Sequence, residues 1–294
     1  GDMIVYAALF GFGGAKLFDI LEAPQSFFNM LKAVREGKQE IGSALFSGLT
    51  FYGGLIVAGA AIILYARKHK INIIHLCDSF APAMMIAYAV GRIGCQVAGD
   101  GDWGIANSAF ISNEQGQSVL AASSEQFTNA IHANAAYVSS RFGSVDAFHH
   151  LSIKPILGLP NWMFGYTFPH NVVNDGVKLA GCDGSFCSYL PLPVFPTPFY
   201  EAVTCSILFF VLWSLRKKIK TPGLLFGIYL IFNGVERFFI EKIRVNATYD
   251  WFYNSFGIKI TQAEIISFML VLLGVFFVVQ SKKWAVKFAT KQSV

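Results

Sequence analysis

Long apolar runs recur along this chain and are separated by polar stretches. Six of these runs are close to the ~20 residues that an α-helix needs to cross the hydrocarbon core of a bilayer. They cover residues 3–21, 44–66, 72–91, 197–215, 222–240 and 261–280. The pattern predicts an all-α integral membrane protein with about six transmembrane helices in this chain.

The composition agrees with this prediction. Of the 294 residues, 54% are hydrophobic and only 14% are charged, whereas soluble domains carry about 25% charged residues. The net charge of +5 fits an integral membrane protein with basic cytoplasmic loops. We therefore expect membrane lipids, and no nucleic acid, among the molecules that this protein contacts.

Basic residues follow the second, fourth and sixth apolar runs. They are Arg67, Lys68, Lys70, Arg216, Lys217, Lys218, Lys220, Lys282, Lys283, Lys287 and Lys291. If the six helices alternate in direction, all three clusters lie on one side of the membrane, which the positive-inside rule makes the cytoplasmic side. The chain then begins inside, and residues 92–196 lie outside.

The same pattern divides the chain into four expected regions. Residues 1–91 hold the first three helices, and residues 197–281 hold the last three. Residues 92–196 are expected to form a signature loop followed by an extracytoplasmic cap, because this stretch is too long for a simple connection. Residues 282–294 are expected to form a basic cytoplasmic tail.

Two of the five cysteines, Cys182 and Cys187, stand in the expected cap. The outer side of the membrane is oxidising, so a disulfide that closes a small loop is the favoured interpretation. A metal site is the weaker alternative, because no histidine lies within a few residues of either cysteine. Cys77 and Cys205 lie in apolar runs and are interpreted as small hydrophobic residues.

Polar and ionisable residues interrupt three of the apolar runs. The first run contains Lys16 and Asp19, and the third contains Asp78. The fifth run leads into FNGVERFFIEKIR, where the following residues lie on or beside one helix face: Asn233, Glu236, Arg237, Glu241 and Arg244. Because such groups are costly inside a bilayer, they are expected to be paired or functional.

Two interpretations of this helix face remain open. The structural one is an i,i+4 ion pair of Arg237 with Glu241 that helps the helices to pack. The functional one follows from depth, because Arg237 is expected in the outer third of its helix. Three polar residues from other runs are expected at the same depth: Arg92, Tyr200 and Glu201.

Arginines at this depth suit an anionic phospholipid headgroup, because guanidinium groups bind phosphate oxygens in bidentate fashion. Arg92 stands in GRIGCQVAGDGDWG, where glycines permit close approach and Asp100 or Asp102 can orient the arginine or move a proton. Tyr52, from the second run, is expected at a similar depth. These residues predict a lipid site at the outer leaflet, but they do not separate an enzyme from a lipid transporter.

Four stretches carry a family resemblance. They are FYGGLIVAG (51–59), GRIGCQVAGDGDWG (91–104), PTPFYE (196–201) and ERFFIEKIR (236–244). In this order they resemble the motifs of the bacterial phosphatidylglycerol–prolipoprotein diacylglyceryl transferases, and the resemblance covers most of the chain. Members of that family have seven membrane spans, so this chain is expected to lack the first one.

The resemblance implies a reaction. The diacylglyceryl group of phosphatidylglycerol is transferred to the lipobox cysteine thiol of a preprolipoprotein, and glycerol phosphate is released. The implied partners are phosphatidylglycerol and preprolipoprotein signal peptides, and no metal or organic cofactor is implied. The resemblance also implies a multi-pass protein of the bacterial cytoplasmic (inner) membrane, with its active site facing the outer leaflet.

The depth argument and the resemblance together give the candidate site residues. The candidate catalytic residues are Arg92, Arg237, Glu241, Tyr52, Asp100 and Asp102. The candidate substrate-binding residues are Gly91, Gly94, Cys95, Gly104, Tyr200, Glu201, Asn233 and Arg244. The arginines would neutralise the leaving phosphate, and the acids are candidate bases for the incoming thiol, whose ordinary pKa is ~8.5.

Three positions depart from the usual pattern of the family. Tyr52 stands where histidine is usual, and Cys95 stands where asparagine is usual. The loop is one residue longer, so either Asp100 or Asp102 matches the family's acid. A phenol with a pKa of ~10 is a poor base, so Tyr52 is expected to donate a hydrogen bond to phosphate.

Three alternatives stay open beside the transferase. A relative that only binds lipid or lipoprotein is favoured by Tyr52. A transporter of anionic lipid would be favoured by inverted repeats, which the sequence does not show. A covalent mechanism through Cys95 has the least support, because the family needs no enzyme nucleophile.

Overall fold

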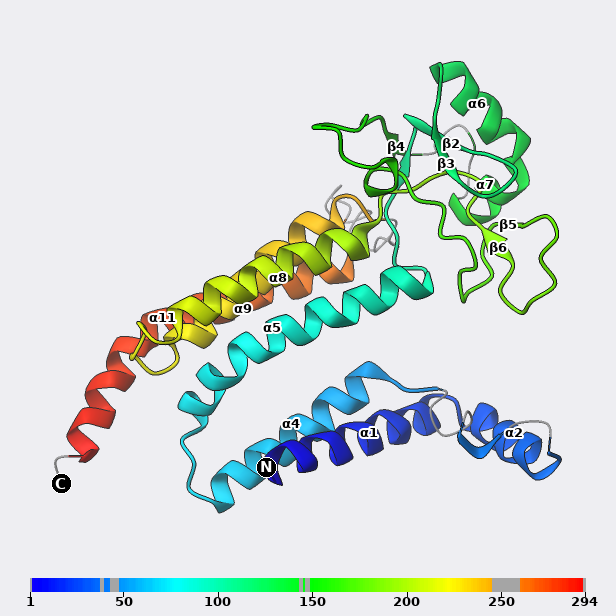
Figure 1. Cartoon of the computed structure of the whole chain (residues 1–294). Helices are drawn as coiled ribbons and strands as arrows, with labels where there is room; N and C mark the ends of the chain where they lie inside the picture. Colours follow the sequence, from blue (N-terminus) through cyan, green and yellow to red (C-terminus); the bar gives the residue numbers. More distant parts are fainter. Residues whose placement is uncertain are drawn as a thin grey trace. The chain divides into compact units, whose positions relative to one another are not determined.

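Helices make up most of the structure, a computed structural model that describes residues 2–37, 40–42, 48–142, 145, 149–244 and 260–292 (Figure 1). The chain divides into two compact units, Gly1–Leu76 and Cys77–Val294, called here the N-terminal unit and the main unit. Residues 44–47 of the second predicted run and 293–294 of the predicted tail lie outside the described residues.

The N-terminal unit is built on two long helices, α1 (Asp2–Glu22) and α4 (Phe51–Lys68), with α2 (Pro24–Arg35) following α1. Glycines let α1 and α4 approach closely, as in many helix pairs of membrane proteins. A Cβ atom on Gly14 would lie 2.6 Å from the carbonyl oxygen of Gly53, and a Cβ atom on Gly53 would lie 2.5 Å from the carbonyl oxygen of Gly14. Larger residues at either position would therefore force the helices apart.

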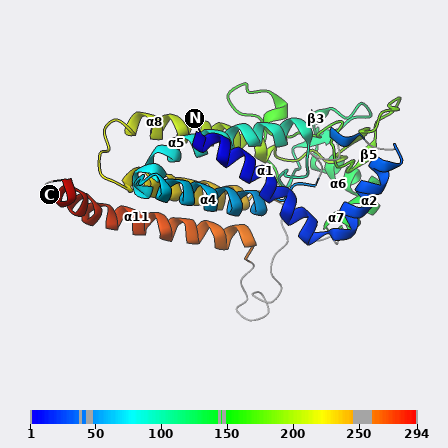
Figure 2. The same cartoon turned by 90° about the horizontal axis from the view of Figure 1, so that it is seen from below.

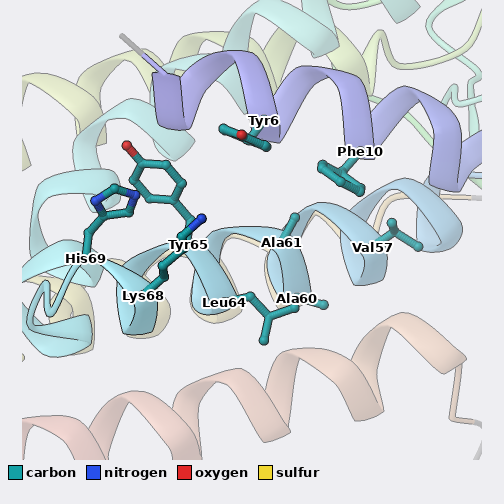
Figure 3. A pocket seen from close by; sticks show the side chains of 9 residues that line it. All are labelled: Tyr6, Phe10, Val57, Ala60, Ala61, Leu64, Tyr65, Lys68 and His69. Atoms are coloured by element: carbon teal, nitrogen blue, oxygen red, sulfur yellow. The ribbon is translucent and has the colours of Figure 1, made fainter.

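Nearer the start of α1, the same two helices enclose a groove of about 360 Å³ (Figure 3). Tyr6 and Phe10 of α1 face α4 across a floor that includes Ala60 and Ala61. The groove is mostly apolar and contains none of the candidate site residues predicted from the sequence.

The charged residues predicted within the first run form a local pair. Lys16 Nζ lies 3.3 Å from Asp19 Oδ2, one turn further along α1. This agrees with the expectation that charges in an apolar helix are paired or functional, and here they are paired.

Four helices form the main unit: α5 (Ile73–Ala98), α8 (Thr197–Leu215), α9 (Leu224–Glu241) and α11 (Gln262–Gln292). α9 contacts both α8 and α11. Their core includes Met85 of α5, Cys205 of α8 and Tyr229 of α9, and Cys205 is fully buried, as expected for a small hydrophobic residue. Glycines also set the contact of α9 with α11, because a Cβ atom on Gly227 would lie 2.9 Å from the carbonyl oxygen of Gly274.

Asp78 of α5 caps α9. Its Oδ2 accepts a hydrogen bond from the Gly223 N–H at 2.6 Å, and its Oδ1 accepts one from the Phe226 N–H at 2.8 Å. The first N–H groups of a helix have no partner within the helix, and a carboxylate there also interacts favourably with the helix dipole. The charge that interrupts the third apolar run therefore has a structural role.

Each of the six predicted apolar runs contains a helix. Among the described residues, four helices are long and apolar enough to cross a membrane: Asp2–Glu22, Ile73–Ala98, Thr197–Leu215 and Gln262–Val286. The protein is thus a mostly helical membrane protein, and the number of six spans stays a prediction. Two boundaries differ from expectation, because α5 continues past residue 91 to Ala98 and α11 continues through the predicted tail to Gln292.

Residues 99–196, called here the cap segment, fold between α5 and α8. Three pairs of short strands occur in it: β1 (Ala106–Asn107) with β4 (His150–Leu151), β2 (Phe110–Ser112) with β3 (Ser118–Leu120), and β5 (Val177–Lys178) with β6 (Ser188–Tyr189). It also contains α6 (Ser124–Ala133), α7 (Ala135–Phe142) and the 3-10 turn η1 (Asn161–Met163). The prediction of an all-α fold is therefore too narrow for this segment, and its extracytoplasmic position stays a prediction.

The cap segment has its own apolar core and one disulfide. Phe127 and Val138 pack in one cluster, and Phe168 and Leu190 in another. The disulfide joins Cys182 to Cys187, so the favoured interpretation of these cysteines is confirmed and their thiols are not metal ligands.

Candidate anion-binding site

A cluster of charged residues forms where α5, α8 and α9 meet the start of the cap segment, entirely within the main unit. Its members, called here the charged cluster, are Arg92, Asp102, Glu201, Arg237, Glu241 and Arg244. All six were predicted as site residues from the sequence. The structure brings them together from positions up to 152 residues apart, counted from Arg92 to Arg244.

Glu201 is the centre of the charged cluster. Its side chain is fully buried, and its Oε2 lies 2.9 Å from Arg92 Nε and 3.4 Å from Arg237 Nη1. The hydroxyl of Tyr88 donates a further hydrogen bond to the same oxygen at 2.5 Å. One buried carboxylate therefore positions side chains from α5 and α9 at once.

Asp102 joins Arg92 to the third arginine. Its two carboxylate oxygens accept hydrogen bonds from Arg92 and from Arg244. Burial alone would raise the pKa of the Asp102 carboxyl, but the guanidinium groups of Arg244 and Arg92 outweigh it and hold that pKa below its usual value. Asp102 is therefore ionised at neutral pH and is a weak base.

The predicted i,i+4 pair on α9 is present but does not explain the arrangement by itself. Arg237 Nη2 lies 3.7 Å from Glu241 Oε2, while Nη1 of the same guanidinium reaches Glu201 on α8. Arg244, just beyond α9, also lies 3.9 Å from Glu201 through its Nη1. Three guanidinium groups thus converge on one acid of another helix, which a ladder along α9 alone would not require.

Backbone contacts hold the loop that carries Asp102. The Gly104 N–H donates to Phe195 O and the Ile105 N–H to Ile243 O, both at 2.9 Å. A Cβ atom on Gly104 would lie 2.7 Å from Ile243 O, so only glycine fits there. Thr197, at the start of α8, donates from its hydroxyl to Asp102 O at 2.8 Å. The loop is therefore fastened to the start of α8 and to the end of α9.

The other predicted residues of this loop have different positions. Asp100 is exposed, and its Oδ1 accepts the Asp102 N–H at 3.3 Å. Only Asp102 of the two acids reaches the arginines. Cys95 Sγ lies 3.8 Å from Arg92 Nη1. Gly91 and Gly94 lie on α5, with open space where a Cβ atom would stand.

The three remaining predicted residues have the following positions. The Tyr200 hydroxyl donates to Met163 O of the cap segment at 2.5 Å. Asn233 lies partly buried on α9, one turn before Arg237. Tyr52 lies on α4 in the N-terminal unit, where its side chain is exposed, and its part in the site stays a prediction.

Two residues beside the charged cluster were not among the candidate site residues, although the sequence had placed Glu236 on or beside the same helix face. Tyr88 lies one turn before Arg92 on α5, and the Arg92 guanidinium carbon lies 5.0 Å from the centre of its ring. The i,i+4 spacing was a usable signal for this contact. Glu236 is 6% exposed, and neither of its carboxylate oxygens has a hydrogen-bond partner among the described residues.

Further buried polar atoms near Glu236 lack hydrogen bonds within the described part of the chain. They include Arg244 Nε and Glu201 Oε1. Buried polar groups nearly always have hydrogen-bond partners, so such atoms call for water or a polar ligand. Unused guanidinium N–H groups can bind phosphate oxygens.

A metal ion suits this arrangement less well than an anion. Cys95, Asp100 and Asp102 offer ligand atoms within 4.8 Å of one another. However, Asp102 already lies between two guanidinium groups, whose positive charge repels a cation. We therefore assign no metal to these residues.

Apolar helices whose ends meet in a buried arginine–carboxylate cluster define a multi-helix membrane protein with a candidate anion-binding site. The family model for prolipoprotein diacylglyceryl transferases matches residues 1–280. The chain belongs to this family, which confirms the resemblance seen in the four sequence motifs.

Individual relatives agree with this assignment. The chain is similar to proteins named phosphatidylglycerol–prolipoprotein diacylglyceryl transferase from Leptospira interrogans (24% identity, covering 84% of this chain and 64% of the relative) and Chlorobaculum tepidum (28%, covering 83% and 60%). A protein of the same name from Streptococcus uberis is 24% identical and is covered more fully, over 96% of this chain and 78% of its own length. The chain thus spans less than two thirds of the length of the first two relatives.

Proposed function

We propose that this protein transfers the diacylglyceryl group of phosphatidylglycerol to the lipobox cysteine thiol of a prolipoprotein. The observation that carries the proposal is the convergence of Arg92, Arg237 and Arg244 on Glu201 at the ends of apolar helices. Membership of the transferase family and the names of the relatives support the same reaction. In this view the protein is a transferase whose partners are phosphatidylglycerol and prolipoprotein signal peptides.

The proposed chemistry is displacement at carbon. The thiolate sulfur attacks the diacylglyceryl carbon that carries the phosphate, a C–S bond forms, and the C–O bond to phosphate breaks. The electron pair of that bond leaves with glycerol phosphate. Arg92 and Arg237 stabilise the negative charge that grows on the leaving oxygen, as fixed hydrogen-bond donors do in water-poor sites. Arg244, with unused N–H groups, can bind a further phosphate oxygen.

The thiol proton needs an acceptor, because the thiolate is the nucleophile. Asp102 is a poor choice, since two arginines lower its pKa. Glu201 is also a poor choice, since Arg92, Arg237 and Tyr88 already donate to its Oε2. Glu241, whose Oε2 lies 3.7 Å from Arg237 Nη2, is the remaining acid of the charged cluster, and we assign it as the acceptor.

The proposal also covers location. We place the protein in the bacterial cytoplasmic membrane as a multi-pass protein, with the cap segment outside and the charged cluster facing the outer leaflet. The basic residues after the second, fourth and sixth apolar runs support this orientation. No metal or organic cofactor is part of the proposed reaction.

A second candidate is a relative that binds lipid or lipoprotein without transfer. Tyr52 favours it, because a tyrosine stands where a histidine is usual in the family. The charged cluster, which neutralises a leaving phosphate, favours the transferase.

A transfer assay separates the candidates. Purified protein in vesicles containing phosphatidylglycerol is mixed with a lipobox peptide, and the products are followed by mass spectrometry. We expect a peptide heavier by one diacylglyceryl group together with free glycerol phosphate, and no adduct when the peptide cysteine is replaced by serine. Binding of lipid and peptide without an adduct would favour the non-catalytic relative. Movement of phosphatidylglycerol between leaflets without an adduct would favour a transporter.

A further inference from the structure

One loop of the cap segment exposes a group of large apolar side chains. Leu157 is 92% exposed, Ile156 58% and Leu159 42%. Ile153 and Trp162 of the same stretch are also exposed. Among the described residues of the cap segment, no other stretch of ten residues holds as many exposed large hydrophobic side chains. We call residues Ile153–Phe164 the apolar loop.

A single buried asparagine closes the base of the apolar loop. Asn107 Nδ2 donates to Ile153 O at 2.8 Å and to Phe164 O at 2.9 Å, and its Oδ1 accepts the Ile153 N–H at 3.0 Å. The two ends of the loop are therefore held together, which is the geometry of an Ω-loop. Such loops are frequently functional.

The tip of the apolar loop has a defined shape. Leu157 has a φ of +55° and Gly158 a φ of +70°, so the chain turns in the left-handed region. The Leu159 N–H closes the turn by donating to Ile156 O at 3.0 Å. Left-handed backbone is unfavourable for leucine. A costly conformation that presents an apolar side chain outward is more consistent with a contact surface than with a neutral connection.

The apolar loop is attached to a transmembrane helix. The Trp162 ring lies 4.9 Å from the Phe199 ring between centres, and the Tyr200 hydroxyl donates to Met163 O. Phe199 and Tyr200 lie in the first turn of α8, which is long and apolar enough to span a bilayer. The base of the loop therefore lies at the depth where α8 begins, while the part after β4 projects from the cap segment (Figures 1 and 2).

We propose that the apolar loop inserts its tip, Ile156–Leu159, into the leaflet at which α8 begins. Its apolar side chains then leave water for the acyl-chain boundary, and Trp162 lies at the headgroup level that tryptophan prefers. This proposal goes beyond the transfer reaction and requires only that α8 spans the membrane.

A lipid surface fits the apolar loop better than a peptide does. A tip whose central leucine is 92% exposed is convex and offers no groove for an apolar peptide segment, whereas a bilayer accepts a convex apolar surface. The loop is also continuous with α8 through Trp162 and Phe199, so it meets the bilayer without a further rearrangement. The insertion would hold the cap segment at a fixed height above the membrane.

Photo-crosslinking at the tip tests the proposal. A benzophenone amino acid replaces Leu157, and the full chain is placed in vesicles of phosphatidylethanolamine and phosphatidylglycerol with a lipobox peptide present. The matched control carries the same group at Leu120, an exposed leucine of β3 in the same segment. We expect phospholipid adducts at position 157 at several-fold higher yield than at position 120.

Other products at position 157 would overturn the proposal. Adducts only with the lipobox peptide would identify a peptide-docking surface, and adducts only with this chain would show that another part of the protein covers the loop. Equal lipid yields at positions 157 and 120 would also contradict it. An unfolding midpoint in denaturant equal to that of the wild type shows that the protein is folded in each variant.

A second variant tests the proposal without a benzophenone group at position 157. With the crosslinker at Ile156, Leu157→Asp should reduce the lipid adducts several-fold, because it places a charge at the inserted tip. Leu120→Asp in the same background should leave the yield unchanged. An unchanged yield with Leu157→Asp would show that the tip does not enter the membrane.

Discussion

Charged residues occur in apolar helices of both units, but they are paired in different ways. In the N-terminal unit, Lys16 and Asp19 neutralise each other within one turn of α1. In the main unit, Glu201 of α8 meets Arg92 of α5 and Arg237 of α9. An ion pair within one helix forms without any other helix and indicates a structural role. A convergence of several helices on one buried carboxylate is costly to arrange, and we propose it as the site.

Removing the central carboxylate should have the largest effect. Glu201→Gln leaves buried guanidinium groups without their shared counter-charge, and we expect a loss of about 3–5 kcal/mol in the free energy of unfolding. Denaturant titration in detergent measures this loss. Glu125→Gln, on an exposed position of α6, should change the free energy of unfolding little. A loss below ~1 kcal/mol for Glu201→Gln would mean that this carboxylate does not organise the cluster.

Changing the geometry of one arginine should act mainly on the reaction. Lysine cannot reach Glu201 and Asp102 together as the Arg92 guanidinium does. We expect Arg92→Lys to lower the transfer rate by ~10² to 10³, equivalent to about 2–4 kcal/mol. Rates per folded molecule in the peptide assay test this, with Arg141→Lys in the cap segment as the control. Near-normal rates for Arg92→Lys would make this arginine a packing residue.

Replacing Asp102 should change the free energy of unfolding in a pH-dependent way. Arg244 and Arg92 depress the pKa of Asp102 in the folded state, so its stabilising contribution is present above the unfolded pKa of ~3.9 and is lost as the pH falls through the lower folded value. The stability difference between the wild type and Asp102→Asn should therefore be constant near neutral pH and shrink below about pH 4. Unfolding midpoints measured from neutral to acidic pH test it. A difference that does not change with pH would show that the ionised form of Asp102 is not what stabilises the fold.

The local pair of the N-terminal unit should matter least. Replacing both partners, with Lys16→Gln and Asp19→Asn, removes a pair without leaving an isolated charge, and we expect a change of about 1 kcal/mol or less in the free energy of unfolding. The transfer rate should stay within about twofold of the wild type. A tenfold change in rate would require the variant to change the activation free energy by about 1.36 kcal/mol. A large loss of transfer rate with an unchanged free energy of unfolding would contradict the structural role of this pair and give it a role in the reaction.

The sequence predicted the helices better than their ends. Apolar length and composition are local properties, so every apolar run contained a helix. The predicted end of α5 was wrong, because the apolar run stops before Arg92, yet the helix continues to Ala98. Gly91 and Gly94 lie within this helix, where open space surrounds the position of a Cβ atom. The short strands of the cap segment were missed because each is only two or three residues long, too short for an alternating pattern to show. The pairing of β1 with β4 also joins distant residues, such as Ala106 with His150.

The sequence was enough to predict which residues belong to the charged cluster, but not which of them contact one another. Helical periodicity and the family motifs gave Arg92, Glu201 and Arg237. They did not show that Glu201 is the shared acceptor, because this depends on how α5, α8 and α9 pack. Asp78 shows the opposite case, since a charge that was expected to be either paired or functional caps α9 through two backbone N–H groups. Only the packed structure separates these two roles.

Gly104 and Ile105 have a consequence for how the protein is made. Their backbone N–H groups bond to Phe195 and Ile243, and the second partner is 138 residues further along the chain. During synthesis the ribosome must therefore release the end of α9 before the loop with Asp102 can take its final position. Contacts of such long sequence separation form late in folding. Nascent chains that stop before residue 243 should insert their helices into the membrane but lack the proposed activity, so a cell would acquire this activity only after the end of α9 has been translated.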